Sequence, residues 1–457
     1  MRQGGWCVLV AVISICIMGM AFGAVPAEAG YLYAGTSNPG KVYKYNGSSW
    51  QAISESLGYA VLDIIEFEGK LFAATMSSAI PPPPNPPGPY SGVGKVWRYE
   101  GGTSWTIVKD NLDDQVCDLE VWDGDLYAGT AWSGGRLYRY DRYAETFELV
   151  GEIPDWYGIR AMYASSYGYL QLGEINVDKF GRFDGYTFYD DLNHEGSCIY
   201  DFAEFNDALY GAAYNGRLFR STDGIEWSMV LGYSSDRNIW ELEPFQGHLY
   251  MSYHSGLLAR LNTSQTKSTV WTAPDGIISM VADGDSVLYL GIGAEAGALW
   301  HSETDGVGSV YAYRGNGSPL LIADQMGTGV QCLYIPLGAE LAVDIKPGSY
   351  PNSINPKSWG KIPVAILSTE DFDAPDEVDR YSLTFGPTGV EDSLAFCGRS
   401  GEDVNDDGYD DLICHFYTQE TGFEAGHTEG VLKGKTVEGT PIEGRDSVNI
   451  VTKGKGK

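Results

Sequence analysis

Short segments that alternate apolar and polar residues recur along most of this chain. The most regular copy is a Leu-Tyr pair followed by small residues, as at 32–36 and 126–130. The second residue of each copy falls at positions 33, 72, 127, 170, 210, 250 and 289, in steps of 39, 55, 43, 40, 40 and 39 residues. The longest step contains a proline-rich insertion at 81–94. A nearly constant period of this length indicates a repeat architecture.

Each copy belongs to a set of four short strands. One alternating strand precedes it, as at 116–119, and another follows it, as at 136–140. A turn then leads to a strand that carries Trp or Phe, as at 226–230. Four antiparallel strands in each repeat are typical of a propeller blade.

The two ends of the repeat region predict how the ring closes. The copy at 32–36 has no strand before it, and the last repeat is followed by an isolated strand at 330–333 that has the pattern of a first strand. Joining the two completes a seventh blade and leaves no unpaired strand edge at the closure. We therefore predict a seven-bladed β-propeller over residues 30–337. The alternative, an open β-solenoid, would not need a split repeat.

The pattern changes after residue 337. The period of about 40 residues stops, and new strands, such as 342–345 and 362–367, are interrupted by Pro and Gly at short intervals. This pattern favours a small β-sandwich over residues 338–450. The Lys/Gly tail at 451–457 is expected to be disordered. The predicted fold class is therefore all-β, a propeller followed by a small sandwich.

The first 29 residues have the features of a Sec-type signal peptide. Arg2 precedes an apolar run of 16 residues at 7–22, and Ala27 and Ala29 supply small residues before the expected cleavage. The run is shorter than the roughly 20 residues of a membrane-spanning helix. We expect a secreted or cell-surface protein with no transmembrane segment in its mature chain, and an N-terminal membrane anchor is the alternative.

Composition and charge narrow the range of partners. The 59 glycines and the 13% of aromatic residues suit short strands and tight turns better than helices. Lys and Arg number 30 against 61 Asp and Glu, so the formal net charge is −31. Such a surface repels phosphate backbones, and we expect no nucleic-acid partner.

An acidic loop in the C-terminal region has the clearest ligand pattern. Oxygen-bearing side chains stand at loop positions 1, 3, 5 and 9, and position 7 can offer its carbonyl: Asp403, Asn405, Asp407, Asp411 and Tyr409. Gly408 at position 6 permits a sharp turn. Ca²⁺ is a hard cation that prefers oxygen ligands in flexible loops. Position 12 is Cys414 instead of a carboxylate, so an EF-hand is not predicted, and an acidic turn without metal is the alternative.

This region also resembles known families. The loop resembles the hairpin calcium loops of integrin FG-GAP repeats and, more loosely, those of dockerins and thrombospondin type 3 repeats. The stretches 343–349, 352–356, 360–367 and 440–444 resemble a C-terminal domain of many exported bacterial and archaeal proteins, over about residues 340–450. The resemblance implies an accessory module that binds Ca²⁺ and has no catalytic residues.

The cysteines are expected to divide into two groups. Cys397 and Cys414 flank the acidic loop, and a disulfide between them suits an exported protein, with two buried thiols as the alternative. Cys117, Cys198 and Cys332 fall on predicted inner strands of separate blades. Inner strands of non-adjacent blades are too far apart for disulfide geometry, so we expect these three to stay reduced.

The predicted inner strands share a level of carboxylates at their third positions. Four of the seven carry an acid there: Asp63, Asp118, Asp201 and Glu241. Two interpretations stay open. The acids form a cation or ligand site at the mouth of the central channel, or each accepts a hydrogen bond from the backbone of a neighbouring blade.

Loops at one end of the predicted ring combine aromatic and charged residues. This candidate rim contains Trp132, Trp156, Tyr157, Glu174, His194, Tyr214, Arg237, Tyr253 and His254. Aromatic faces with interspersed charges suit sugar rings or a protein partner. The alternative is the ordinary loop composition of a Tyr-rich protein.

These observations favour a binding protein over an enzyme without deciding the matter. No nucleophile elbow, HExxH motif or phosphate-binding loop occurs, and only Arg160 and Arg237 stand where a sialidase-type arginine cluster would need them. We expect a secreted or cell-surface protein whose rim holds an extracellular glycan or protein ligand. The alternatives are a carbohydrate-active enzyme, either a polysaccharide lyase or a glycoside hydrolase, and a structural component of the cell envelope.

Overall fold

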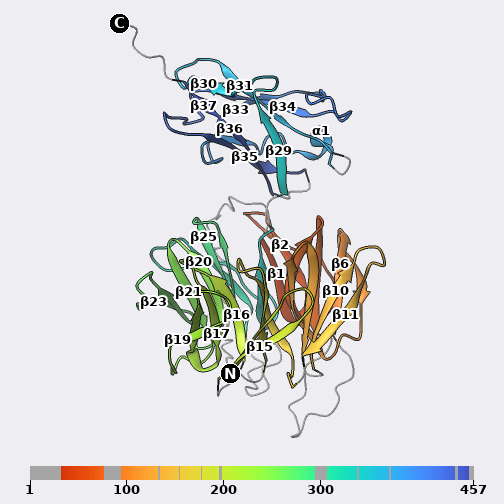
Figure 1. The fold of residues 1–457 in the computed structure, drawn as a ribbon, viewed down its shortest axis with the longest axis vertical. Helices are drawn as coiled ribbons and strands as arrows, with labels where there is room; N and C mark the ends of the chain where they lie inside the picture. The colour runs from red at the N-terminus through yellow and green to blue at the C-terminus, as the bar shows by residue number, and fades with distance from the viewer. Residues whose placement is uncertain are drawn as a thin grey trace, which may run out of the picture.

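A computed structural model describes residues 32–76, 94–131, 134–153, 155–175, 178–194, 198–293, 306–336, 339–369, 372–437 and 441–451. The predicted signal peptide and most of the predicted tail lie outside these residues, so both stay predictions. The predicted all-β class is confirmed, because strands make up nearly all of the regular structure (Figure 1). No helix among the described residues has the length and apolarity that a membrane span requires.

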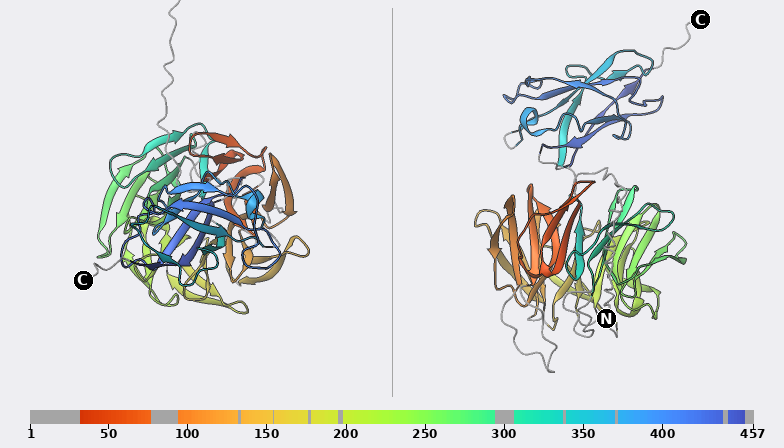
Figure 2. Two further views of the ribbon diagram at one scale, coloured as in Figure 1. Left: turned by 90° about the horizontal axis from the view of Figure 1, so that it is seen from above. Right: turned by 180° about the vertical axis from the view of Figure 1, so that it is seen from behind.

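The described strands form seven four-stranded sets around a central axis, as the view along the axis in Figure 2 shows. Blades 2 to 4 follow in chain order: β4 (Gly58–Phe67), β5 (Lys70–Met76), β6 (Gly94–Gly101), β7 (Ser104–Lys109); β8 (Gln115–Trp122), β9 (Asp125–Ala131), β10 (Gly135–Asp141), β11 (Thr146–Ile153); β12 (Ile159–Ala164), β13 (Leu170–Glu174), β14 (Asp178–Phe183), β15 (Phe188–His194). Blades 5 to 7 continue the series: β16 (Ile199–Glu204), β17 (Leu209–Ala213), β18 (Leu218–Ser221), β19 (Trp227–Leu231); β20 (Ile239–Phe245), β21 (His248–Tyr253), β22 (Leu257–Leu261), β23 (Lys267–Thr272); β24 (Ile277–Asp283), β25 (Val287–Ile292), β26 (Ser309–Tyr313), β27 (Leu320–Ala323).

Blade 1 is assembled from both ends of the repeat region. Its strands are β28 (Gly329–Tyr334), β1 (Leu32–Gly40), β2 (Val42–Tyr45) and β3 (Trp50–Ala52). β28 pairs antiparallel with β1, so that Tyr334 lies opposite Tyr33 and Val330 opposite Thr36. The strand that follows the last repeat thus supplies the inner strand that the first repeat lacks, as the split repeat predicts.

The small residue in the repeated Leu-Tyr segment has a packing role. A Cβ atom on Gly129 of blade 3 would lie 2.8 Å from the Ile159 side chain on the inner strand of blade 4. A Cβ atom on Gly173 would meet Ile199 of blade 5 at the same distance. Glycine at this position therefore lets a β-branched residue of the next blade approach closely, which is the usual reason for Gly within a strand.

The C-terminal strands form two packed sheets. Their elements are β29 (Ala339–Ile345), β30 (Ser353–Ile354), β31 (Lys361–Ile366), α1 (Ala374–Glu377), β32 (Thr384–Gly386), β33 (Leu394–Cys397), β34 (Leu412–Tyr417), β35 (Glu429–Lys435), β36 (Pro441–Ser447) and β37 (Asn449–Ile450). The first half of β29 pairs in parallel with β36, and its second half pairs antiparallel with β31. One sheet therefore has the order β32-β35-β36-β29 and the other β29-β31-β34-β33, as expected of a small β-sandwich.

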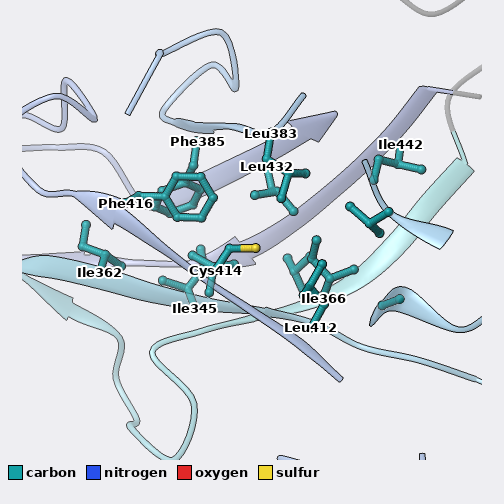
Figure 3. Close-up of a cluster of buried hydrophobic side chains, with 14 of the residues drawn as sticks. Ile345, Ile362, Ile366, Leu383, Phe385, Leu412, Cys414, Phe416, Leu432 and Ile442 are labelled. Atoms are coloured by element: carbon teal, nitrogen blue, oxygen red, sulfur yellow. The ribbon is translucent and has the colours of Figure 1, made fainter. Parts of the chain in front are cut away.

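Alternate residues of these strands fill the sandwich core. Figure 3 shows Ile362, Leu412, Cys414 and Phe416 directed into one apolar cluster with Phe385 and Leu432 of the opposite sheet. The residues between them on β31 and β34 consequently face outward, because successive side chains of a strand point to opposite faces. β28 ends on the side of the ring where Figure 1 places the sandwich, which leaves the loops at the other end of the ring uncovered by it.

Candidate ligand site in the propeller channel

Three of the predicted channel carboxylates join neighbouring blades. Each accepts a hydrogen bond from a backbone N–H on the inner strand of the next blade: Asp63 from Leu119 at 2.9 Å, Asp118 from Met162, and Asp201 from Leu242 at 2.7 Å. This arrangement is the structural interpretation of the sequence pattern.

Burial changes the titration of these blade-linking carboxylates. It raises the pKa of Asp63 to about 6 and that of Asp201 to about 7, although the N–H donors of Leu119 and Leu242 oppose the shift. The pKa of Asp118 is raised well above its usual range, first by burial and then by the nearby charge of Asp63. All three shifts follow from placing acids in a narrow channel where the charged form is poorly solvated.

Glu241 stands at the same level but does not join two blades. The link from blade 6 to blade 7 is made instead by Glu243, which accepts a hydrogen bond from the Ala282 N–H at 3.1 Å. Within the described part of the chain, no hydrogen bond reaches the Glu241 carboxylate. Burial and the charge of Asp201 raise its pKa well above the usual range, and Arg160 opposes this shift. Glu241 is therefore a channel acid whose carboxylate is not used to join one blade to the next.

The channel holds a cavity of about 810 Å³. Each inner strand is irregular at the same level, because one or two residues there have no partner on the second strand of the blade. The residues at these β-bulges are Leu62, Cys117, Arg160, Tyr200, Trp240, Ile278 and Gln331. All except Trp240 line the cavity. Bulges commonly redirect a side chain at a functional site, and here they form a second ring of residues above the carboxylates.

In blades 4 to 6 this ring is aromatic and cationic. The Arg160 guanidinium lies 5.8 Å from the ring centroids of both Tyr200 and Trp240, within cation–π range. The Tyr200 and Trp240 rings meet edge to face at 4.3 Å, and the His254 ring is 5.9 Å from Trp240. The other four bulges carry Leu, Cys, Ile and Gln, so the channel mouth is chemically one-sided.

Loops of blades 5 and 6 complete this sector. The Asn238 amide donates to the Tyr200 hydroxyl at 2.9 Å, and its oxygen accepts from the Asn215 N–H at 3.1 Å. Asn215 and Arg237 adopt φ values of 58° and 67° and both line the cavity. Left-handed backbone at non-glycine residues costs free energy and is frequent at ligand sites. We use the name blade 4–6 sector for the set formed by Arg160, Tyr200, Asn215, Arg237, Asn238, Glu241 and His254.

The structure places some of the predicted rim residues at the cavity or on the surface and buries others. Tyr214, Arg237 and His254 line the cavity, and Tyr157 is exposed near the end of a loop. Trp132 lies outside the described residues. The backbone of His194 ends β15, and its side chain is not described.

Three of the rim predictions need correction, because Trp156, Glu174 and Tyr253 are buried. A Cβ atom on Gly135 would lie 2.7 Å from Trp156, which shows how closely the indole packs against blade 3. The Glu174 carboxylate accepts a hydrogen bond from the Tyr157 N–H at 2.8 Å. The Lys267 ammonium lies 4.3 Å from the centroid of the Tyr253 ring. Glu174 and Tyr253 are the last residues of β13 and β21, and the loop that carries Trp156 folds between blades 3 and 4, so these side chains become part of the packing.

Sequence reasoning missed three residues of the sector and the Trp240 ring beside them. Tyr200, Trp240, Asn215 and Asn238 were not expected there, because a bulge cannot be read from a single strand pattern. A signal was nevertheless present. The residue before each channel acid position is Arg, Tyr or Trp in blades 4 to 6 and none of these in the other blades.

The acidic loop of the sandwich brings together part of its predicted ligand set. The Asn405 amide donates to the Asp407 carboxylate at 2.8 Å, and Asp403 accepts from the Gly408 N–H at 2.9 Å. Asp411 is different, because it is buried and its two oxygens accept from the N–H groups of Ser368 and Val404. Among the described residues, no three carboxylate, histidine or cysteine side chains are arranged to hold a metal ion. The loop therefore gathers Asp403, Asn405 and Asp407, and it uses Asp411 as a structural acceptor.

The cysteines are arranged as follows. Cys397 on β33 and Cys414 on β34 lie opposite each other and form a disulfide. Cys117, Cys198 and Cys332 are buried thiols outside this disulfide. Cys117 and Cys332 lie on inner strands, whereas Cys198 directly precedes β16.

Fold and site together define a β-propeller protein with a chemically one-sided cavity in its channel. No family model and no curated protein matches the chain. Solved structures with a similar fold include the RRP9 WD40 repeats, at 12% identity over 60% of this chain and 87% of that chain, with a TM-score of 0.44. The Sqt1 protein of Saccharomyces cerevisiae is 10% identical over 74% of this chain and 90% of its own, with a TM-score of 0.45. A putative 6-phosphogluconolactonase from Bacteroides fragilis is 10% identical over 67% and 98%, with a TM-score of 0.48. With values this low, the likeness carries no argument about function.

Proposed function

We propose that this is an exported binding protein whose blade 4–6 sector holds an extracellular glycan. The observation that carries the proposal is the departure from repetition around the ring. Three acids join blades in a regular way, whereas Ala161 replaces the acid in blade 4 and Glu241 is uncommitted in blade 6. An architecture that needed only stability would have no reason to concentrate an arginine and an edge-to-face pair of aromatic rings between these two positions.

The chemistry of the sector suits a sugar. A cavity of about 810 Å³ is within the range of ligand pockets. Amide, hydroxyl and carboxyl groups from Asn238, Tyr200 and Glu241 can donate to or accept from sugar hydroxyls, and Tyr214 offers an aromatic face at the mouth. A protein ligand would need a larger surface around the mouth, so we treat it as the alternative outcome of the test.

A binding panel with paired variants tests this proposal. We expect the full chain to bind at least one of a set of soluble oligosaccharides in isothermal titration calorimetry. Arg237→Ala and His254→Ala should each weaken this binding about tenfold, as expected for loss of a hydrogen bond that involves a polar or charged group. Arg139→Ala is the control, because Arg139 lies on β10 outside the sector and pairs with Asp125. Equal loss in all three variants, or binding of proteins but no glycan, would contradict the proposal.

Glu241 favours a second candidate, a carbohydrate-active enzyme that uses the same sector. Burial and the charge of Asp201 raise the pKa of Glu241 inside the cavity, and an acid with a raised pKa can act as a general acid toward a glycosidic oxygen. Turnover of a polysaccharide panel that is lost in Glu241→Gln and kept in Arg139→Ala would favour the enzyme. Tight binding without any product above background would support the binding protein and exclude the enzyme for that panel.

The sandwich is proposed to be a structural module stabilised by Ca²⁺. Support comes from the convergence of Asp403, Asn405 and Asp407 around the turn at Gly408, where three oxygen side chains and the Tyr409 carbonyl would hold the ion. Asp411 would act behind these ligands by fixing the loop to Ser368 and Val404.

Export is supported by the Cys397–Cys414 disulfide, since disulfides persist mainly in oxidising compartments. Fractionation of the producing cells would distinguish a secreted protein from a structural component of the envelope. Protein found in the medium or removed from cells by competing sugar supports the binding role. Protein that stays with the envelope under both conditions supports the structural alternative.

A further inference from the structure

The outer face of the sheet β31-β34-β33 carries an exposed group of rings around one lysine. Phe396 and Tyr417 are large apolar side chains with 50% and 42% of their surface exposed. The Lys361 ammonium lies 5.6 Å from the Phe396 ring centroid and 5.3 Å from that of Tyr417. The Phe396 and His415 rings are stacked, with centroids 4.5 Å apart and an interplanar angle of 24°. We call Lys361, Phe396, His415 and Tyr417 the ring–lysine patch.

The strands hold this patch in a fixed arrangement. Phe396 lies opposite His415, and the next pair along the two strands is the disulfide between Cys397 and Cys414. A register shift between Leu394 and Phe396 forms a bulge that turns Phe396 outward on an edge strand. A covalent link beside a stacked pair reduces the ordering that a ligand would otherwise have to impose, which favours binding.

The charge of the patch is unusual for this protein. The chain as a whole carries a formal charge of −31. Among the described residues, no ion pair or hydrogen bond engages the Lys361 ammonium, whereas Lys433 and Arg445 on the other sheet pair with Glu443. Burial, and then the charge of Lys361, lowers the pKa of His415, so the charged form of this imidazole is disfavoured beside the Lys361 ammonium. An unpaired ammonium among exposed rings is complementary to an anionic group on a flat ligand.

We propose that the ring–lysine patch binds a polysaccharide whose sugar rings carry carboxylate groups. The Lys361 ammonium pairs with a carboxylate, and the apolar C–H face of the same sugar packs against the exposed parts of Phe396 and Tyr417. A peptide fits this face poorly, because the bulge interrupts the edge strand to which an extended peptide would add. The proposal goes beyond the propeller site and does not depend on it.

Binding of uronic acid oligomers to the full chain with its disulfide intact tests the proposal. The probe is an oligogalacturonate too short to form a gel, and its fully methyl-esterified form is the matched neutral probe. We expect the acid form to bind and the ester to bind at least about tenfold more weakly, because esterification removes the charge that Lys361 recognises. Lys361→Gln should bring the affinity for the acid form down to that for the ester.

Paired variants separate the patch from general effects. Phe396→Ala and Tyr417→Ala should each weaken binding about fivefold or more. Lys433→Gln and Tyr186→Ala should leave it unchanged, since Lys433 lies on β35 of the other sheet and Tyr186 is an exposed aromatic residue of the propeller. Thermal melting checks that each variant is folded, and Phe396→Leu provides an apolar replacement if Phe396→Ala is unstable.

The other outcomes overturn the proposal. Equal affinity for acid and ester, or no affinity for either, rules out carboxylate recognition. A dimer in light scattering that Phe396→Ala dissociates would assign the face to a second copy of the chain. Loss of binding in Arg237→Ala with no effect of Lys361→Gln would place the uronate in the propeller channel, which would support the propeller proposal and refute this one.

Discussion

The carboxylates that join the blades make a prediction in which two substitutions of one residue have different consequences. Asp201 accepts the Leu242 N–H at 2.7 Å, and burial raises its pKa from 3.8 to about 7. Asp201→Asn keeps an acceptor for this N–H and removes the titration. Asp201→Ala removes both, so that the Leu242 N–H is left without its acceptor.

The magnitudes follow from the structure. An acid whose pKa is higher in the folded state stabilises the fold below its unfolded pKa, here near 4, and this contribution is lost as the pH rises to about 7. A shift of about three pH units corresponds to at most about 4 kcal/mol. Water in the channel screens the charge, so we expect about 2 kcal/mol. Between pH 4 and pH 8, Asp201→Asn should therefore gain about 2 kcal/mol of stability relative to the parent. Asp201→Ala should add a cost of about 1–3 kcal/mol at both values of pH.

Urea unfolding followed by tryptophan fluorescence measures these differences. Trp359 is the only tryptophan after residue 338, and it is 91% exposed, so the change in signal reports mainly on the propeller. An identical pH dependence in the parent and in Asp201→Asn would show that the acid is not buried as described. Equal destabilisation by Asn and Ala would show that the bond to Leu242 is not what joins blades 5 and 6.

Three further predictions concern closure, thiols and calcium. Deletion of residues 30–37 should remove the partner of β28 and lower the melting temperature of the whole propeller in calorimetry, and a melt like that of the parent would contradict the closure. The chain without residues 1–29, unfolded without reductant, should present three thiols to a labelling reagent, whereas five would mean that Cys397 and Cys414 are reduced. Calcium at a hundredfold excess over Kd should stabilise the sandwich by about 2.7 kcal/mol. Chelator should reverse this stabilisation. The variant Asp407→Ala should lose the response to calcium, whereas the control Asp406→Asn should keep it. Identical melting of the sandwich in calcium and in chelator would refute the site.

The fold could be predicted because each repeat contains the residues that determine how one blade packs against the next. The Leu-Tyr segment supplies one core-facing face, and the small residue after it admits the inner strand of the next blade, as at Gly129 and Ile159. The isolated strand at 330–333 then indicates how the ring of blades closes. Each of these signals is local and recurs, so a single sequence contains several independent copies of it.

The site was harder to predict because it depends on departures from that regularity. A bulge shifts register by one residue and leaves no mark in the hydrophobic pattern, so the Tyr200 side chain could not be placed at the channel cavity, nor the Trp240 ring beside it. Exposure in the loops was misjudged for a related reason. Trp156 and Tyr253 occur in segments that read as surface loops, yet the space between adjacent blades is large enough to bury both rings. Asp411 has the spacing of a calcium ligand, but its partner Ser368 is 43 residues away in the sequence.

Hydrogen–deuterium exchange of the full chain, with and without a glycan identified in the binding panel, tests the central claim most directly. If the blade 4–6 sector holds the ligand, peptides that cover 198–200, 214–217, 233–240 and 254–256 should exchange more slowly in its presence. Peptides that cover the hairpin turns at 142–145 and 184–187 should be unaffected, because they lie at the opposite end of the ring. Protection of those turns with no change in the sector would contradict the account.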